Sequence, residues 1–232
     1  MGLLSGLEQL GLGNLEKTDV FEKKEQVFSD TTKAEPVRDA VSLEAELLFE
    51  KTLTCPACGK NFKQKVVRSN KFRLMDTDLD LRPRYEHIDP LKYDVILCTH
   101  CGYAAIGRYF AYITDKQSKQ IKESITYTFR GVEENGEIYT YEEALVRYKL
   151  ALATAIVRHS KDSEKAFICL KAGWLVRGMA EQLDPEEPDY QEKKKMLEDE
   201  ESEFLRNAMD GLIMARQQEN YPICGMEKYT VE

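Results

Sequence analysis

The chain has 232 residues, of which 42% are hydrophobic and 32% are charged, and its formal net charge is -8 at pH 7. This composition is typical of a globular protein with a well-solvated surface, in one large or two small domains. No run of ~18 apolar residues is present, and the N-terminal MGLLSGLEQLGLG lacks the basic flank of a secretory signal, so we expect no membrane span and a cytoplasmic protein.

Residues 1–42 are predicted to be a flexible acidic segment. Four leucines among residues 1–13 have helical spacing, but a weak turn in a mobile terminus is the simpler interpretation. Residues 14–40 are polar and lack apolar periodicity, as a linker does. Residues 43–50, LEAELLFE, are predicted to form a short helix before the first cysteine motif.

Four of the six cysteines form two Cys-x-x-Cys-Gly motifs, TCPACGK and LCTHCGY. Two intervening residues let a tight turn aim both sulfurs at one point, and the glycine lets backbone amides face the thiolates. In a reducing cytosol such pairs indicate a metal before a disulfide. Four thiolates form the closed tetrahedral site of structural zinc. We therefore predict one structural zinc per chain, bound by Cys55, Cys58, Cys98 and Cys101, with iron or a redox pair as alternatives.

The remaining histidines and cysteines have weaker signals. His100 could replace a cysteine as a ligand, but we expect its side chain to point outward. Cys169 lies near an apolar stripe and is predicted to be a buried small hydrophobe. Cys224, in YPICGM, is half a motif without a partner, and we expect it to pack rather than react.

Residues 43–110 are predicted to be a small β domain that resembles a zinc ribbon. KQKVVRSNKFRLM alternates and is rich in β-branched residues, and YDVILC is a compact apolar run. Residues 55–110 carry 10 Lys and Arg against 6 Asp and Glu. This excess raises a nucleic-acid hypothesis, with binding by Lys60, Lys63, Lys65, Arg68, Lys71 and Arg73. The negative charge of a four-thiolate zinc and the sequence pI of 5.2 weigh against it.

The loop DTDLDLRPRYEHIDP, residues 76–90, is the most unusual segment of the chain. Three aspartates at alternate positions lie on one face of an extended strand, where they could bind a hard cation or serve acid–base catalysis. We favour ion pairs that hold the insertion against the ribbon. Candidate binding residues in the loop are Asp76, Asp78, Arg82, Arg84 and Tyr85.

The segment from about Ala104 onward is predicted to be helical, with helices over AAIGRYFAYIT and SKQIKESITYTF. Three longer helices follow, from Tyr141 to His159, from about Ser163 to Asp184, and from about Asp189 to Gln218. Thr140 and Glu143 resemble a capping box. Short connections imply antiparallel neighbours, as in a tetratricopeptide-like stack. The inward stripes include Leu145, Tyr148, Leu152, Ile156, Phe167, Leu170, Trp174, Met179, Leu197, Phe204, Ala208, Leu212 and Ala215.

The fold predicted from these patterns is α+β, mainly α, with a small β domain followed by an antiparallel helical domain at residues 111–232. An apolar segment, Tyr221 to Met226, follows the last helix. Because the residues after it are too few for a stable isolated helix, we expect it to fold back onto the third long helix. Alternatively, a second copy of the chain covers it, which would make self-association possible.

The motifs together resemble a bacterial family, domain-of-unknown-function family 2225. The resemblance rests on TCPACGK, VRSNKFRLMDTDLDLRPRY, DPLKYDV, LCTHCGYAA and YPICGM, and covers most of the chain after residue 48. It implies a zinc-ribbon-like segment followed by tetratricopeptide-like helices, in a cytosolic protein of unassigned function. It also implies a further helical pair after the PICGM-like segment, so that the helical domain of this chain is expected to be shortened.

Three functions are consistent with the sequence. A scaffold with a structural zinc and a helical surface for a protein or peptide is the favoured one. A nucleic-acid-binding ribbon is the alternative. An enzyme that uses the acidic loop at residues 76–89 is the third, and it lacks a recognisable nucleophile–base pair, phosphate loop or open metal site. We therefore expect no enzymatic activity.

Overall fold

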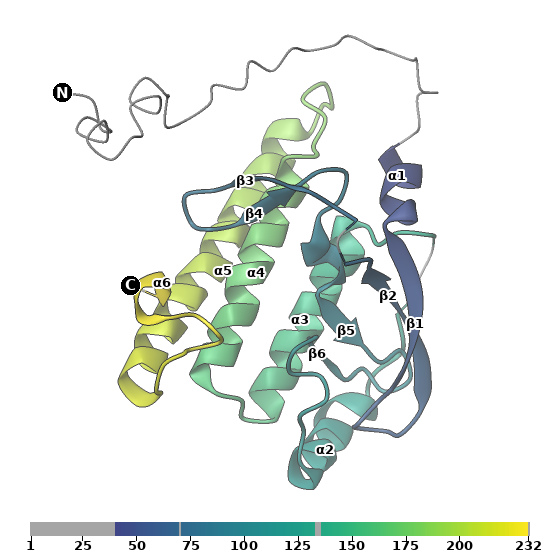
Figure 1. Cartoon of the computed structure of the whole chain (residues 1–232), viewed down its shortest axis with the longest axis vertical. Coiled ribbons are helices and arrows are strands. Elements are labelled where there is room, and N and C mark those ends of the chain that lie inside the picture. Colours follow the sequence, from purple (N-terminus) through teal and green to yellow (C-terminus); the bar gives the residue numbers. More distant parts are fainter. Residues whose placement is uncertain (1–39, 70, 133–135, 232) are drawn as a thin grey trace, which may run out of the picture. The chain divides into compact units, whose positions relative to one another are not determined.

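The computed structural model describes residues 40–69, 71–132 and 136–231 (Figure 1). The expectations for residues 1–39 lie outside this range. The first described element, α1 (Ala40–Glu46), leads directly into strand β1 (Leu48–Thr54). The helix predicted over residues 43–50 therefore ends earlier, because its last three residues belong to the strand.

The strands form three antiparallel pairs rather than one sheet. Strand β1 pairs with β2 (Asn61–Val67), β3 (Leu74–Thr77) with β4 (Pro83–Tyr85), and β5 (Val95–Leu97) with β6 (Ala104–Ile106). Each cysteine motif is the turn of a hairpin, since one lies between β1 and β2 and the other between β5 and β6. The β3–β4 hairpin is inserted between these two, and a 3-10 turn, η3 (Pro90–Tyr93), leads from it into β5.

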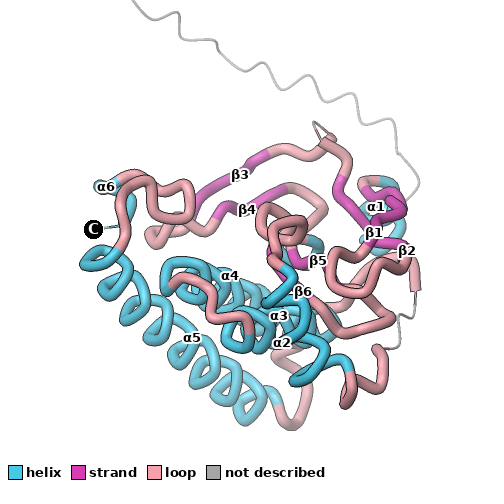
Figure 2. Tube along the Cα trace, turned by 90° about the horizontal axis from the view of Figure 1, so that it is seen from below, coloured by secondary structure: helices cyan, strands magenta, loops and turns pink. Residues whose placement is uncertain are grey.

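The helices of the second half confirm the predicted positions closely. They are α3 (Tyr141–Val157), α4 (Asp162–Ala180) and α5 (Tyr190–Gln218), preceded by α2 (Asp115–Ile121) with a π-helical extension, η4 (Lys122–Thr126), and followed by α6 (Lys228–Val231). The capping box of α3 is present, because the side chains of Thr140 and Glu143 each accept from the other residue's backbone amide. Figure 2 shows α3, α4 and α5 side by side in one helical layer.

The main core joins the helices to the third hairpin. Leu97 and Ile106 from β5 and β6 are buried with Tyr148 of α3 and Leu175 of α4. Trp174 is 7% exposed in the same cluster, as predicted. The hairpin β5–β6 and the helices therefore share one core, and the described residues from position 40 onward belong to one compact unit. The finer division at residue 110 stays a prediction.

Two details of the helical prediction are wrong. AAIGRYFAYIT is not a helix, because its first three residues form β6 and the rest a series of turns up to Thr114. Its apolar residues instead serve the hairpin, where all three β6 side chains are buried. Ile156 is not inward, since it is 56% exposed. Thr154 and Ala155 in the same turn are buried, so the last turn of α3 reaches the core through another face and Ile156 lies on the solvent side.

The C-terminal segment folds back within the chain. Ile223 is buried, and Cys224 and Met226 pack against the main core. A short turn joins the backbones of Ile223 and Met226, and Arg108 donates to the carbonyl oxygen of Cys224 at 2.6 Å. None of the helices in the described ranges has the length and apolar character needed to cross a lipid bilayer.

Candidate metal centre

The two cysteine motifs have matching backbone geometry. In the first, the amide of Gly59 donates to the carbonyl of Cys55 at 2.8 Å, and in the second, Gly102 donates to Cys98 at 2.9 Å. Both glycines have φ of +75°, a left-handed conformation that a residue with a side chain adopts only at a cost. The glycine that follows each cysteine pair thus closes the turn that brings the two sulfurs together.

The four cysteine sulfurs converge on one point. The Sγ atoms of Cys55, Cys58, Cys98 and Cys101 all lie within 4.8 Å of one another. Cys55 and Cys101 are 3.6 Å apart at Sγ, and Cys58 and Cys98 are 3.7 Å apart. A tetrahedron of thiolates around zinc, with bonds of ~2.3 Å, has edges of ~3.8 Å. The donor set and its spacing therefore fit a tetrahedral metal ion.

The ionisation of the sulfurs also favours a bound cation. Without one, the Cys101 thiol donates hydrogen bonds to Cys55 and Cys98, which raises its pKa, while the Cys98 thiolate accepts hydrogen bonds from Cys101 and Cys55, which lowers its pKa. Cys98 is thus the first cysteine to ionise, and its thiolate is stabilised by neighbouring thiols that stay protonated. Four thiolates at these distances repel one another, and a divalent cation at their centre removes that repulsion.

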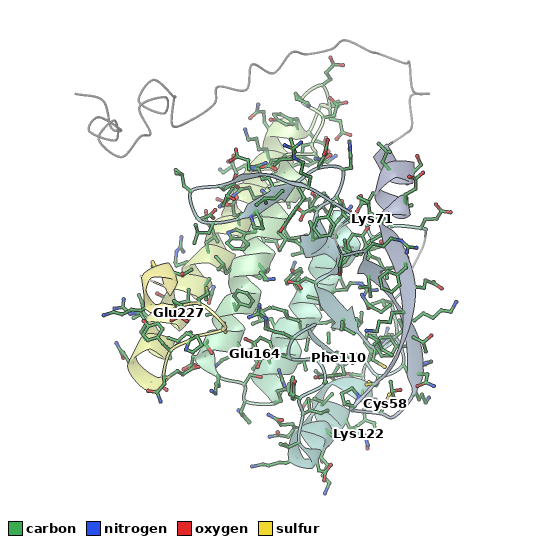
Figure 3. All side chains as sticks on the ribbon, in the orientation of Figure 1. Cys58, Lys71, Phe110, Lys122, Glu164 and Glu227 are labelled. Carbon is green, nitrogen blue, oxygen red and sulfur yellow. The ribbon has the colours of Figure 1, made fainter. Side chains whose placement is uncertain are left out.

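A small apolar core of its own surrounds the cluster. Cys55, Cys98 and Cys101 are buried with Phe62, Ala105, Tyr103, Phe110, Ile121 and Ile125. The helix α2 and its extension cover the cysteine turns, because Ser118 donates to the carbonyl of Ala57 and Thr126 to that of Cys101, both at 3.0 Å. Figure 3 labels Cys58 in the first cysteine turn and Lys122 at the start of this extension.

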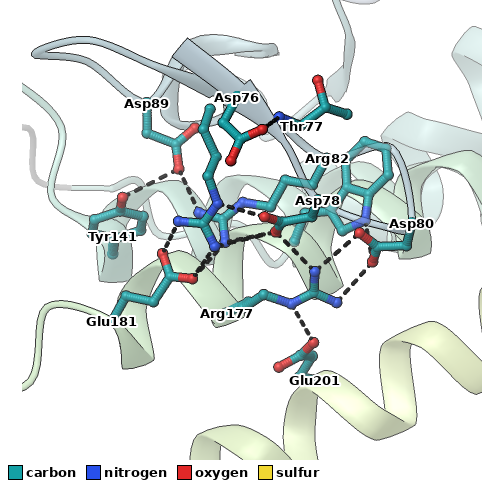
Figure 4. Close-up of polar contacts among 12 residues, drawn as sticks. Asp76, Thr77, Asp78, Asp80, Arg82, Asp89, Tyr141, Arg177, Glu181 and Glu201 are labelled. Atoms are coloured by element: carbon teal, nitrogen blue, oxygen red, sulfur yellow. Dashed lines mark hydrogen bonds and ion pairs between the residues drawn. The ribbon is translucent and has the colours of Figure 1, made fainter.

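The acidic loop forms an ion-pair network. Arg177 of α4 binds Asp78 and Asp80 of the hairpin at 3.1 and 2.7 Å, and Glu201 of α5 at 2.7 Å (Figure 4). The indole nitrogen of Trp174 donates to Asp80 at 2.9 Å. This network therefore joins the hairpin to two helices.

A second group of contacts fixes the other strand of the hairpin. Arg84 donates to both carboxylate oxygens of Glu181, at 3.1 and 2.6 Å, and also pairs with Asp78. Arg82, whose side chain is 5% exposed, pairs with Glu181 at 3.2 Å and with Asp89 at 3.6 Å. The expected ion pairs are present, but they hold the loop against the helices α4 and α5 rather than against the ribbon.

The comparisons with known proteins identify a family. Residues 48–232 match the family described as an uncharacterized protein conserved in bacteria, DUF2225. The chain belongs to this family. No curated protein and no solved structure matches this chain.

In this DUF2225 chain the basic candidates of the first hairpin are largely engaged in contacts of their own. Lys63 pairs with Glu50 at 2.8 Å, Lys65 lies over the ring of Tyr139, and Arg68 donates to the carbonyl of Leu48 at 3.0 Å. These contacts reduce the positive charge that is free to meet a phosphate backbone. Lys60, Lys71 and Arg73 are exposed.

The other sequence candidates lie away from the metal cluster. His100 is exposed and its Nε2 is 3.0 Å from the carbonyl of Asn61, so it joins the two cysteine turns from outside. Cys169 is buried and burial raises its pKa to about 11. Asp76 is exposed and accepts from the amide of Thr77, and Tyr85 stacks edge-on against Phe72.

Sequence reasoning missed the helical partners of the hairpin. Arg177 lies in the last turn of α4 and Glu181 is the C-cap residue of that helix, four residues further on and so on the same side. In the sequence, this spacing cannot be distinguished from ordinary surface charge. Gly178 lies between them, and a Cβ there would be 2.7 Å from the Nη2 atom of Arg82. A cleft of about 670 Å³ opens beside this glycine, lined by the hairpin and by the ends of α3 and α4.

Acidification is expected to release the hairpin. Hydrogen bonds from Arg84 lower the pKa of Asp78; for Asp80, burial acts to raise the pKa, but hydrogen bonds from Arg177 and Trp174 lower it overall. In the folded protein the pKa values of Asp78 and Asp80 therefore lie below the unfolded value of ~3.9. Their ion pairs stabilise the hairpin fully above that pH, and this stabilisation is lost as the pH falls through the folded-state pKa values. Asp89 changes stability in the opposite direction as the pH falls, because burial raises its pKa.

The measurement is an NMR titration of the amide signals of Met75 and Leu81. We expect little change from neutral pH down to ~4 and a cooperative change below it. Arg177→Gln should move the change to higher pH, because Asp80 loses its main partner. Amide shifts that change around pH 6 instead would mean that other groups hold the hairpin.

Proposed function

We propose that this protein is an interaction scaffold whose cysteine-bearing hairpins are fixed by one structural zinc ion. The observation that carries the zinc assignment is the four-sulfur cluster, in which Cys55, Cys98 and Cys101 are buried and Cys58 is partly buried, with Sγ distances of 3.6 and 3.7 Å along opposite edges. Zinc favours four soft ligands in a tetrahedron, and such a site leaves no position for a substrate. The metal therefore supplies stability, and the activity lies on the surface of the protein.

Purified protein is expected to contain one zinc per chain. Elemental analysis after dialysis against buffer without chelator measures this directly, with colour and visible absorption as a check for iron. A stoichiometry near zero, or an iron absorption band, would contradict the assignment. Under native conditions, stepwise modification of the thiols in the presence of a zinc-sensitive dye should release the metal as soon as the first ligand thiolates are modified, since the ligands act together.

The surface that supports a scaffold role is the outer side of α5. This helix packs against α4, yet Met209, Ile213 and Met214 remain 55%, 47% and 46% exposed. Met209 and Ile213 are four residues apart and so are neighbours on the helix surface. Methionine is flexible and polarizable, which suits a surface that adapts to a protein partner.

The test is affinity capture from the native cells with three forms of the full chain. Wild type and Val146→Glu, a control on the exposed side of α3, should retain the same protein in stoichiometric amount. The double variant M209E/I213E should lose it, because two carboxylates would have to be buried on binding. Equal recovery of the partner protein with all three forms would show that the exposed face of α5 does not bind it.

A nucleic-acid role is the second candidate, and its support is the three exposed cations Lys60, Lys71 and Arg73. Binding of a labelled generic RNA or DNA at low salt, weakened steeply by added salt, would favour it. An enzyme that uses the acidic loop has less support. The pKa values of Asp78 and Asp80 are lowered by their arginine partners, so neither is suited to proton transfer near neutral pH.

A further inference from the structure

The outer strand of the β3–β4 hairpin has an open edge. Within the described residues β3 pairs with β4 alone, and all four of its residues are exposed. Figure 2 shows β3 on the outer side of the hairpin, with β4 between it and the helical layer. An exposed edge strand offers backbone N–H and C=O groups that can pair with another extended chain.

The hairpin also presents apolar side chains to solvent. Leu74 and Met75 on β3 are 52% and 57% exposed, and Leu79 and Leu81 at the tip are 106% and 54% exposed. The register of the hairpin shifts between Leu74 and Asp76, so two successive side chains are exposed instead of one. Four large apolar side chains in eight residues are a concentration that a monomer surface seldom keeps without a use.

The hairpin is held to the helices by ion pairs while its apolar side chains are exposed to solvent. Asp78 and Asp80 are fixed by Arg177, and Arg84 by Glu181. Apolar burial contributes little to this attachment, because the apolar residues of the tip face solvent. A strand that is already ordered loses less conformational entropy when a partner binds.

The size of this surface distinguishes between two possible binding partners, a second copy of this chain and a single extended peptide. A stable dimer needs roughly 800 Å² from each partner, or about 20–30 residues a side, and a four-residue strand with a short tip falls well below that. A single extended peptide needs only main-chain pairing and a few side-chain contacts. The exposed cations Lys71 and Arg73 precede β3 directly, whereas Asp76 within the strand is exposed and negative, so acidic residues of the peptide complement the N-terminal end of the edge.

We infer that the outer edge of β3 binds, by strand addition, an extended peptide segment of a partner protein that combines alternate apolar residues with acidic ones. Leu74 and Met75 contact the apolar residues of the peptide, and Lys71 and Arg73 face its carboxylates. This surface is distinct from the exposed face of α5, and each can fail without the other.

The experiment selects ligands for the full, zinc-loaded chain from a displayed library of random peptides. Enriched sequences should alternate apolar and polar residues and carry Asp or Glu. Their synthetic, fluorescein-labelled forms should bind wild type, and L74E/M75E should weaken binding by about tenfold or more. K71E/R73E should weaken the acidic peptides and not neutral analogues. Hydrogen exchange at residues 74–77 should slow in the complex.

The matched control is V146E/I156E, which changes two apolar residues of α3 that are 47% and 56% exposed and should bind the peptides as wild type does. Circular dichroism of each variant checks that it is folded. Failure to enrich any peptide, or equal binding by L74E/M75E, overturns the inference. Protection of residues 74–77 that grows with protein concentration in the absence of peptide overturns it as well, because a second copy would then be the occupant.

Discussion

Replacing Cys98 with serine is expected to abolish stoichiometric metal binding and to destabilise the protein by roughly 4 kcal/mol or more. Cys98 is buried at the turn of β5–β6, and its sulfur lies 3.7 Å from that of Cys58. Without the metal, the turn of β1–β2 loses the coordinate bonds that tie it to β5–β6, and the exposed contact of His100 with the carbonyl of Asn61 remains. Strand β1 has little apolar burial to replace that tie, since five of its seven residues are exposed.

Elemental analysis and thermal unfolding measure the two effects, and hydrogen exchange locates them. Residues 51–67 should lose protection first, while the centre of α4 keeps it because its core lies elsewhere. Cys224→Ser is the matched control, since it makes the same chemical change outside the cluster. Full zinc content in C98S would show that metal binding does not depend on all four thiolates. Equal destabilisation by Cys224→Ser would show that the loss of stability does not come from the cluster.

Truncating Trp174 to alanine is expected to cost about 3–5 kcal/mol. The side chain is 7% exposed and packs in the main core, and its indole also donates to Asp80 at 2.9 Å. The variant therefore leaves a cavity in the helical layer and removes one of the contacts that hold the hairpin. Chemical denaturation gives the change in unfolding free energy.

Trp174→Phe separates the two roles. The aromatic ring still fills most of the space, so the loss should be about 1–2 kcal/mol, from one hydrogen bond and a small volume change. Asp80 keeps Arg177 as a partner at 2.7 Å, which limits the cost. If the phenylalanine variant were as unstable as the alanine variant, the hydrogen bond to the hairpin would outweigh packing.

The hairpin at residues 74–85 shows where inference from the sequence stops. The alternation of aspartates and the nearby arginines indicated ion pairs correctly, because opposite charges close in the chain can meet in any extended loop. Their strongest partner, Arg177, is 97 residues away from Asp80. No local pattern identifies which of many surface arginines a folded loop will meet.

The sequence by itself determined the cysteine cluster and the long helices. Cys-x-x-Cys-Gly geometry is local, since a glycine in the left-handed conformation closes each turn, and helix ends follow from nearby caps such as Thr140. Only the tertiary structure decided that AAI at residues 104–106 is a strand, because its partner β5 outweighs helical spacing. It also decided which helices hold the acidic loop and which core buries Ile223, since contacts between distant segments depend on how the elements pack.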